Sequence, residues 1–540
     1  MMGTLPTDRQ PEFFSYHIDL ERRIRADHPL RQIKSILDLS FVIPLVQDSY
    51  GRCGHVSLDP RVIVKLMFLL FYYDVPSERE LMAQLPERLD WLWFLDYDLE
   101  SCTPQHSVLS KARRRWGPEV FERLFVRSVE QCVRAGLVDG RLLHADSSTI
   151  KANASKDSVV KTSPEMVQAL RQAYQKEEQK LVVLPEEVPA ADDPPEAPKP
   201  PNNSETVTKQ GLFNQTHVSR TDPEAELART KTGLRELSYK EHRLVDDAHG
   251  VVTAVMATSG SVGDASQLPG LIEQHRSTTA LKPASMTVAG DHHYGSVSNY
   301  LYCAEQGIRA HLASSSAQLE ARNKIPVEEF IYEAQADRLR CPAGHYLVLH
   351  QNRPEEQAKV YLIEQARLCA QCSLRARCTT AVRGRSVQRH LQSPLIEQWR
   401  AEARSTAAFY SRKRRKHVME GSFADAANNH GLKRARWRGL RRQRIQSWLI
   451  AAVQNLRLLL RKTAKWPKPA AVNVEIPIGF VSQLWEKLLI GSLAWQQVLW
   501  ALRSLKSQLP SGVGLKSSDA TRLPACLEKT TLSNTPVRRL

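Results

Sequence analysis

Apolar residues in the N-terminal part of the chain recur with the period of an α-helix and are interrupted by helix-start signals. Asp59 precedes a proline, and this pair favours a helix that begins there and continues through Val62 and Leu70. Ser77, with Glu80 three residues later, forms a capping box and predicts a second helix start. The pattern therefore predicts a mostly helical N-terminal region.

The pair Thr103-Pro104 repeats the cap-then-proline signal and predicts a helix rich in polar and basic residues. Successive capped helices, the last of them basic, are typical of a helix-turn-helix that reads DNA. From the residues alone, a plain helical bundle with a solvated basic face accounts for the pattern at least as well. If this helix does contact DNA, the candidate contact residues are Gln105, His106, Lys111 and Arg114.

The middle of the chain changes from helical to strand periodicity. The segment Leu142–Asp146 predicts a short strand whose alternation places His144 and Asp146 on one face. Further strands, the first two forming a hairpin, are predicted at His242–Asp247, Val251–Thr258 and Met286–Asp291. Antiparallel strands followed by strand–helix alternation are typical of an α/β domain with a mixed sheet.

Two segments do not fit a packed core. Pro185–Pro201 holds seven prolines in 17 residues, which predicts an extended surface linker. The residues after Pro510 are rich in Ser, Thr and Lys and are expected to be loose.

Composition and charge limit the classes of partner and the cellular compartment that we expect for this protein. The chain has 540 residues, more than one core usually holds, and its 75 Lys and Arg outnumber 58 Asp and Glu, for a net charge of +17. Such a surplus indicates a polyanionic partner, either nucleic acid or an anionic membrane surface. The apolar run Leu66–Tyr73 is far shorter than the roughly 20 residues of a spanning helix. The start of the chain lacks the apolar core of a signal peptide, and an odd total of nine cysteines argues against a disulfide scaffold, so we expect a cytoplasmic protein.

Three carboxylates carry the candidate chemistry. Asp146 and Asp291 each end a short apolar strand, and carboxylates at strand ends line the ligand crevice of open α/β sheets. Two neighbouring carboxylates repel unless a cation neutralises them, and oxygen ligands suit Mg²⁺. Glu420 is the candidate third acid, preceded on one helix face by Arg412 and Lys416. A cap or turn role for each aspartate and an ordinary ion pair for Glu420 are the alternatives, and spacing alone does not exclude them.

Four cysteines have a spacing that is typical of metal ligands. They are Cys341, Cys369, Cys372 and Cys378, in an otherwise cysteine-poor chain. A Cys-x2-Cys pair with two further cysteines predicts a structural Cys₄ zinc site, in which His345 could replace a ligand. Unliganded thiols and redox chemistry are the alternatives.

Five segments, in order, resemble a known family. They are HVSLDPRVIVKLMFLLFYYDVPSERELMAQL with WLWFLDYD and TPQHSVLSKARRRW, HADSSTIKANAS, TDPEAELART with LSYKEHRLVDDAHGVVTAVMATSGSVGDASQL, VAGDHHYGSVSNYLYCAEQGI, and RRKHVMEGSFADAANNHGLKRARWRGL with QNLRLLL. Together they resemble the DDE transposases of IS4-type bacterial insertion sequences, most closely the IS1182 family. The chain departs from the family pattern at His292 and His293, where small residues are more usual, and at Lys413 and Lys416 before the glutamate.

The resemblance implies an RNase H-like mixed-sheet catalytic domain in which Asp146, Asp291 and Glu420 hold two Mg²⁺ or Mn²⁺ ions. It implies cleavage of the element's terminal inverted repeats, joining to target DNA, and a homodimer on double-stranded DNA in the bacterial cytoplasm, at the nucleoid. The phosphate-contact candidates are Arg412, Lys413, Lys416, Arg436 and Arg438. A catalytically inactive DNA-binding regulator and a nuclease without strand transfer are the rival functions.

The expected organisation has a helical DNA-binding domain first and a Cys-rich insertion within the catalytic domain. In sequence order, the expected ranges are the helical domain 1–140, the catalytic core 141–157 and 222–315 with a Pro-rich insertion at 158–221, the Cys-rich insertion 316–399, the glutamate helix 400–465, and a helical segment with a loose tail 466–540.

Overall fold

A computed structural model describes residue 2 and residues 19–51, 56–180, 209–229, 233–313 and 322–463. The proline-rich Pro185–Pro201 and the expected C-terminal segment 466–540 lie outside the described residues. Among the helices that are described, none is both long and apolar enough to cross a bilayer.

The N-terminal region is helical, as its apolar period predicts. Its α-helices are α1 Leu20–Arg23, α2 Pro29–Ile36, α3 Val42–Val46, α4 Pro60–Tyr72, α5 Glu78–Gln84, α6 Leu89–Phe94, α7 Ser107–Trp116 and α8 Glu119–Arg134. Both predicted caps are confirmed, because Asp59 accepts the Arg61 N–H at 2.7 Å and Ser77 accepts the Glu80 N–H at 3.1 Å.

The predicted helix start at Thr103-Pro104 is wrong. Helix α7 begins at Ser107, and the backbone from 102 to 105 has no regular structure. Gln105 and His106 are exposed, and the next apolar side chain to be fully buried is Leu109. A local cap signal fixes a helix start only where burial of the following turn stabilises it.

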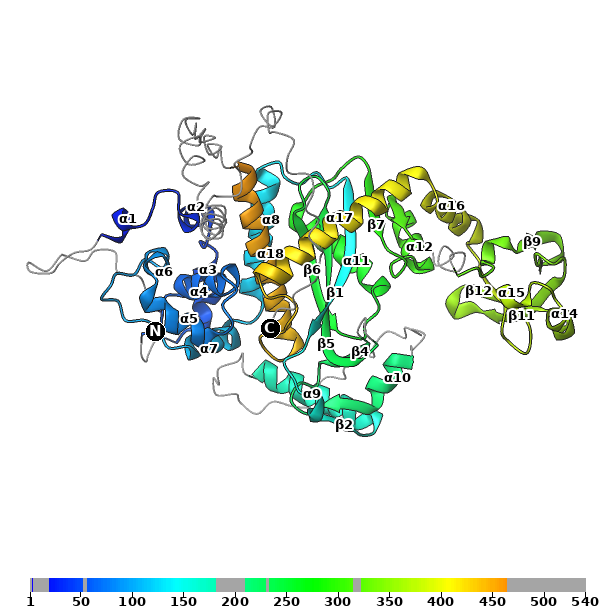
Figure 1. Ribbon diagram of the computed structural model, residues 1–540, viewed down its shortest axis with the longest axis horizontal. Coiled ribbons are helices and arrows are strands. Elements are labelled where there is room, and N and C mark those ends of the chain that lie inside the picture. The colour runs from blue at the N-terminus through cyan, green and yellow to red at the C-terminus, as the bar shows by residue number, and fades with distance from the viewer. Residues whose placement is uncertain are drawn as a thin grey trace, which may run out of the picture. The chain divides into compact units, whose positions relative to one another are not determined.

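A mixed sheet forms the centre of the described chain (Figure 1). Its strands are β1 Leu142–Lys151, β4 Glu226–Arg229, β5 Arg235–Asp246, β6 Val252–Ser259, β7 Met286–Gly290 and β8 Ile308–Leu312. The order is β4-β5-β1-β7-β8, with β6 also paired to β5. Strands β1, β7 and β8 are parallel to one another, whereas β5 is antiparallel to both β1 and β6.

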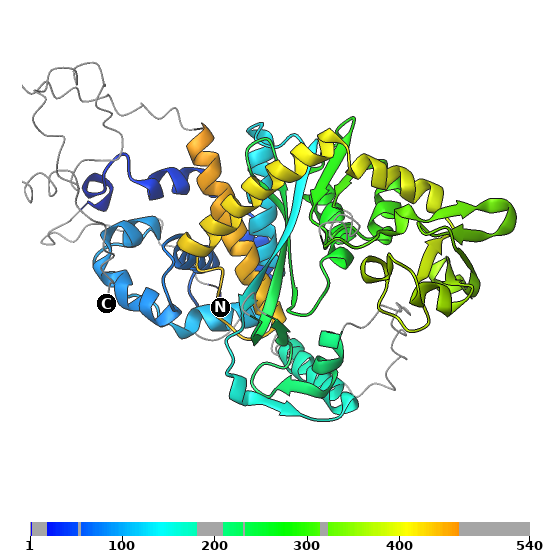
Figure 2. The same cartoon turned by 45° about the vertical axis from the view of Figure 1, so that its right-hand side comes forward.

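Helices connect and cover the parallel strands. Helix α11 (Leu268–Thr279) lies between β6 and β7 in the chain, and α12 (Val297–Glu305) makes the crossover from β7 to β8 that parallel neighbours require. On the opposite face, α17 (Thr406–Asn429) crosses β1, β7 and β8, as two views show (Figure 2). This arrangement confirms the α/β class with a mixed sheet.

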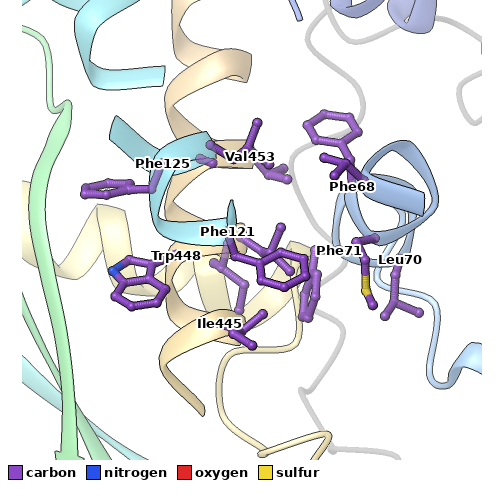
Figure 3. Close-up of a cluster of buried hydrophobic side chains, with 14 of the residues drawn as sticks. Phe68, Leu70, Phe71, Phe121, Phe125, Ile445, Trp448 and Val453 are labelled. Atoms are coloured by element: carbon purple, nitrogen blue, oxygen red, sulfur yellow. The ribbon is translucent and has the colours of Figure 1, made fainter. Parts of the chain in front are cut away.

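Helix α18 (Leu440–Thr463) joins the helical region to the sheet, because it contacts both α8 and β6. Figure 3 shows side chains of α4, α8 and α18 gathered in one apolar cluster, which includes Phe71, Phe121 and Ile445. These side chains are at most 1% exposed, so the N-terminal helices and the sheet share one hydrophobic core.

The segment expected as a Pro-rich insertion contains regular elements at its two ends. They are β2 Val159–Lys161, α9 Pro164–Lys180, α10 Lys209–Thr216 and β3 His217–Ser219, and β2 pairs with β3.

The expected Cys-rich insertion forms a separate five-stranded antiparallel sheet in the order β13-β12-β11-β10-β9. The elements of this part of the chain are β9 Ile331–Glu333, β10 Arg338–Arg340, β11 Tyr346–Arg353, β12 Ala358–Ile363, α14 Ala366–Ala370, α15 Arg375–Cys378, β13 Ser386–His390 and α16 Ser393–Ala403. Short 3₁₀ turns occur at Gln47–Ser49, Leu85–Glu87, Lys156–Ser158, Ala265–Gln267, Val327–Glu329, Ala334–Ala336 and Pro354–Glu356.

Candidate active site

Asp146 and Asp291 lie at matching positions on adjacent parallel strands. In the register of β1 and β7, His144 pairs with Ala289. Asp146 stands two residues after His144, and Asp291 stands two residues after Ala289. Asp146 does not end its strand as predicted, because β1 continues to Lys151 while pairing with β5. It lies beside the point where the parallel partner β7 stops, within β1 rather than at its end.

Asp146 is held by a cation from α17. Its Oδ2 lies 2.5 Å from the Arg415 guanidinium, and its Oδ1 accepts the Ser147 N–H at 2.8 Å. Burial raises the pKa of the Asp146 carboxyl, Arg415 opposes that shift, and the negative charge of Asp291 adds to it. The site therefore combines two repelling carboxylates with a basic helix above them.

A second ion-pair network lies beside Asp146. The fully buried His144 Nε2 lies 2.8 Å from Asp247 Oδ1, which also accepts a hydrogen bond from Arg414 Nε at 2.7 Å. Burial lowers the pKa of His144. Burial would raise the pKa of Asp247, but the hydrogen bonds from His144 and Arg414 outweigh it and the pKa lies below its usual value. Sequence reasoning missed Arg414 and Asp247, although the same-face position of His144 and Asp146 was a signal for a site there.

Glu420 lies on α17 but on another face from the residue that contacts Asp146. Its side chain is exposed. Arg415 stands five residues earlier, which separates the two side chains by about 140° around the helix axis. The structure therefore brings Asp146 and Asp291 together with Arg415, and it does not bring Glu420 to them.

The turn after β7 presents Asp291 in a fixed conformation. Asp291 Oδ1 accepts the His293 N–H at 2.9 Å, and the Asp291 carbonyl accepts the Tyr294 N–H at 3.1 Å. Tyr294 is fully buried. A Cβ on Gly295 would lie 2.0 Å from the Ala313 carbonyl oxygen, so only glycine fits this close approach to the end of β8.

Within the described part of the chain, one group of three His, Cys, Asp or Glu residues brings its ligand atoms within 4.8 Å of one another. It consists of Asp291, His292 and His293. In the sequence alone, the two histidines stand out only as a departure from a family pattern.

All four predicted DNA contacts of the helical region are at the surface. Gln105, His106, Lys111 and Arg114 are exposed at or before α7. The intervening Arg113 is buried instead, in an ion pair with Glu78. Its burial lowers the pKa of its guanidinium, which Glu78 partly offsets.

Of the predicted phosphate contacts near the glutamate helix, the two lysines are exposed on α17, whereas the three arginines bond to other groups of the protein. Lys413 and Lys416 are exposed on α17, whereas Arg412 donates to the Ala403 carbonyl at 2.6 Å. Arg436 is 9% exposed and pairs with Asp74 at 2.6 Å, so it ties the loop before α18 to the helical region. Arg438 is exposed and donates to the Asn153 carbonyl at 3.0 Å.

The four spaced cysteines converge on one small cavity. They line it together with His345, and they carry no disulfide. Burial raises the pKa of the Cys378 thiol, Arg385 lowers it, and the three other cysteines raise it further. Among the residues described, no three of these sulfur atoms lie within 4.8 Å of one another.

Asp246, next to the network around His144, gives a pH prediction. Its two oxygens accept the Gly140 and Ala248 N–H groups at 2.8 and 3.0 Å, and burial raises its pKa to about 6. In the unfolded chain the Asp246 carboxyl titrates near pH 4. The contribution of the protonated carboxyl to the free energy of unfolding is therefore fully present below pH 4 and is lost as the pH rises through 6. Between pH 4 and 8, the unfolding free energy of the parent should fall relative to Asp246→Asn by up to about 3 kcal/mol.

Urea unfolding of both proteins across this pH range measures the difference. A difference that stays constant with pH, or that grows in favour of the parent, would contradict the prediction for Asp246.

Comparison with protein families finds two matches to this chain. Residues 18–115 match the family described as Transposase domain (DUF772), and residues 340–460 match the family described as Transposase DDE domain. The first match runs from α1 into the last turn of α7, and the second contains the four cysteines and Glu420. Neither match includes Asp146 or Asp291, and a comparison with curated proteins finds no match. The chain is therefore similar to a transposase domain over residues 18–115 and to a transposase DDE domain over residues 340–460.

Proposed function

We propose that this protein is a metal-dependent DNA transposase that cuts the ends of an IS1182-type insertion sequence and joins them to target DNA. The observation that carries the proposal is the pair Asp146 and Asp291 on adjacent parallel strands beneath the basic helix α17. The two transposase domain matches on either side of this pair support it.

The strand order supports an RNase H-like catalytic domain. The five central strands follow the order β6-β5-β1-β7-β8, so that the third, second, first, fourth and fifth in sequence lie side by side. Only the second of them is antiparallel to its neighbours. The carboxylates sit where β1 passes the end of β7, at the crevice in which open α/β sheets bind ligands.

The donor set fits a divalent cation. Asp146 and Asp291 are oxygen ligands whose mutual repulsion raises the pKa of Asp146, after the larger effect of burial, and a cation would relieve that repulsion. Of the two carboxylates on α17, Asp425 accepts hydrogen bonds from Asn429 and Gln454 at 2.8 Å each, which leaves Glu420 as the proposed third acid. A bound Mg²⁺ or Mn²⁺ would supply Lewis-acid stabilisation and an activated water for phosphodiester cleavage.

The chain's own cations would hold the DNA backbone. Lys413 and Lys416 are exposed on α17, while Arg415 pairs with Asp146 and Arg414 pairs with the nearby Asp247. This positive surface lets a phosphodiester approach the acids, because it screens their charge. The exposed residues at α7 would contact the terminal repeats, and two DNA ends held together require two copies of the chain.

The test is cleavage of a DNA fragment that carries the element's ends by the full chain, with Mg²⁺ or with EDTA. The parent should cut only with Mg²⁺, and Asp146→Asn should cut about 1000-fold less or worse, because the variant keeps the shape of the side chain and loses its charge. Purified products are then offered a target plasmid, and joined products are expected.

Other results have defined meanings. Equal cutting by the parent and Asp146→Asn would overturn the assignment of the site. Tight DNA binding without cutting would identify a catalytically inactive regulator, and cutting without joining would identify a nuclease.

The cysteine cavity is proposed as a structural zinc site. Its donors are Cys341, Cys369, Cys372 and Cys378, and they stand between β10 and β13 of the five-stranded sheet. This sheet has a small apolar core of its own, and small modules of this kind gain much of their stability from a bound metal.

Zinc content tests this proposal. The purified full chain should hold about one zinc per chain, and the double variant Cys369→Ser, Cys372→Ser should hold none and should expose the sheet to proteolysis. Cys102→Ser is the matched control, because Cys102 is exposed and lies outside the cavity. Full zinc content in the double variant would exclude the site.

A further inference from the structure

We infer that His292 and His293 are metal ligands, so that the ion bound at Asp291 has mixed nitrogen and oxygen coordination. The site holds Mn²⁺ or another imidazole-binding divalent ion in preference to Mg²⁺. The inference rests on the proposed function for its role in cleavage, but the coordination itself is tested without DNA.

The ligand geometry carries the inference. One ligand atom from each of Asp291, His292 and His293 lies within 4.8 Å of the others, as for three ligands around one ion. The two imidazole rings lie side by side, with centroids 4.0 Å apart and planes tilted by 41°. His293 is exposed and His292 is half-buried, so both rings are accessible to an ion from solvent.

The turn is built to keep these three residues together. The Asp291 carboxylate accepts the His293 N–H, which fixes its orientation within the turn. Immediately after the histidines, Tyr294 is buried and its carbonyl accepts hydrogen bonds from Ser296 and Asn299 at 2.9 and 2.8 Å. The three ligands therefore stand on an anchored support, which lowers the entropic cost of binding an ion.

Ligand chemistry sets the preferred ion. Mg²⁺ takes oxygen ligands and keeps much of its water, whereas imidazole suits first-row transition ions, and a set of two histidines and one carboxylate is typical of the latter. Two imidazoles beside Asp291 should therefore favour Mn²⁺ over Mg²⁺. Mn²⁺ is also a suitable probe, because it binds thiolates poorly and will not report the cysteine cavity.

The experiment compares Mn²⁺ and Mg²⁺ binding to the full chain without DNA. The double variant His292→Gln, His293→Gln should bind Mn²⁺ at least about tenfold more weakly than the parent, with Mg²⁺ binding unchanged. Pulsed electron paramagnetic resonance of the Mn²⁺ complex should show coupling to imidazole ¹⁴N in the parent and its loss in the double variant. His249→Ala, an exposed histidine on the β5–β6 turn, is the matched control.

The outcomes distinguish the inferred histidine ligands from the proposed transposase function. Unchanged Mn²⁺ affinity and no ¹⁴N coupling would overturn the inference while leaving the proposed transposase intact. Imidazole-coordinated Mn²⁺ in a chain that cuts DNA with neither ion would support the inference and overturn the proposed function. His293→Gln alone provides a variant that keeps the fold, because this side chain is exposed, and it too should weaken Mn²⁺ binding.

Discussion

Replacing Glu420 with glutamine is expected to lower Mg²⁺-dependent DNA cleavage about 1000-fold or more, to the level of Asp146→Asn. The change removes one negative charge and keeps the shape of the side chain, which is exposed, so the fold should not change. A third carboxylate is required because two aspartates offer few oxygen ligands to the ions that phosphodiester cleavage needs. Single-turnover cleavage by the parent and the variant measures the effect.

The result is informative because Glu420 does not point at the aspartates in this structure. Arg415 contacts Asp146 from the same helix, so bringing Glu420 to the site requires Arg415 to leave and α17 to turn or shift. Glu402, on α16, is the rival third acid, since it pairs with Arg309 at 2.9 Å and lies 4.0 Å from His311 on β8. Loss of cleavage in Glu402→Gln, with activity retained in Glu420→Gln, would reassign the third carboxylate.

Replacing Phe121 with alanine is expected to lower the free energy of unfolding by about 3–5 kcal/mol. Phe121 is fully buried on α8, where it lies in the cluster that α4 and α18 share (Figure 3). The truncation removes its apolar contacts and leaves a cavity, because helices packed on three sides cannot collapse into the space. Urea unfolding followed by circular dichroism measures the loss.

The matched control is Phe409→Ala, which removes the same side chain from a position on α17 that is 56% exposed. It should change stability by less than about 0.5 kcal/mol. A loss of under about 1 kcal/mol in Phe121→Ala would show that the helical region and the sheet do not depend on this shared core.

The two results would separate stability from chemistry. Glu420→Gln should unfold like the parent and fail to cut DNA, whereas Phe121→Ala should weaken both properties together. The reason is that α18 packs against α8 on one side and against β6, at the edge of the sheet that carries Asp146, on the other.

Several features were determined by the sequence itself. The caps at Asp59 and Ser77 are local hydrogen bonds between residues two or three apart, so the sequence contains all the information they need. The hairpin of β5 and β6 is equally local, and its turn ends at Gly250 with φ of +82°, a conformation that glycine adopts without strain. The α/β class with a mixed sheet followed from the same alternation of short-range patterns.

Other features were decided by packing between segments far apart in the chain. The start of α7 depends on which residue first reaches the core, and the burial of Arg113 depends on Glu78, 35 residues earlier. Arg436 was expected at the DNA surface and instead pairs with Asp74, 362 residues away. A charge pattern in the sequence cannot distinguish an arginine that binds DNA from one that pairs within the fold, because the local sequence does not show whether the partner is a phosphate or a distant carboxylate.

The candidate site shows the same division. The sequence by itself indicated Asp146 and Asp291, because acids beside short apolar strands are visible in a local pattern. Only the tertiary structure placed them on adjacent strands, brought Arg415 to Asp146 and Arg414 to Asp247, and turned Glu420 to a different helix face. Helix rotation and strand register are set by the burial of side chains across the whole core, and that energy belongs to the fold as a unit rather than to any one segment.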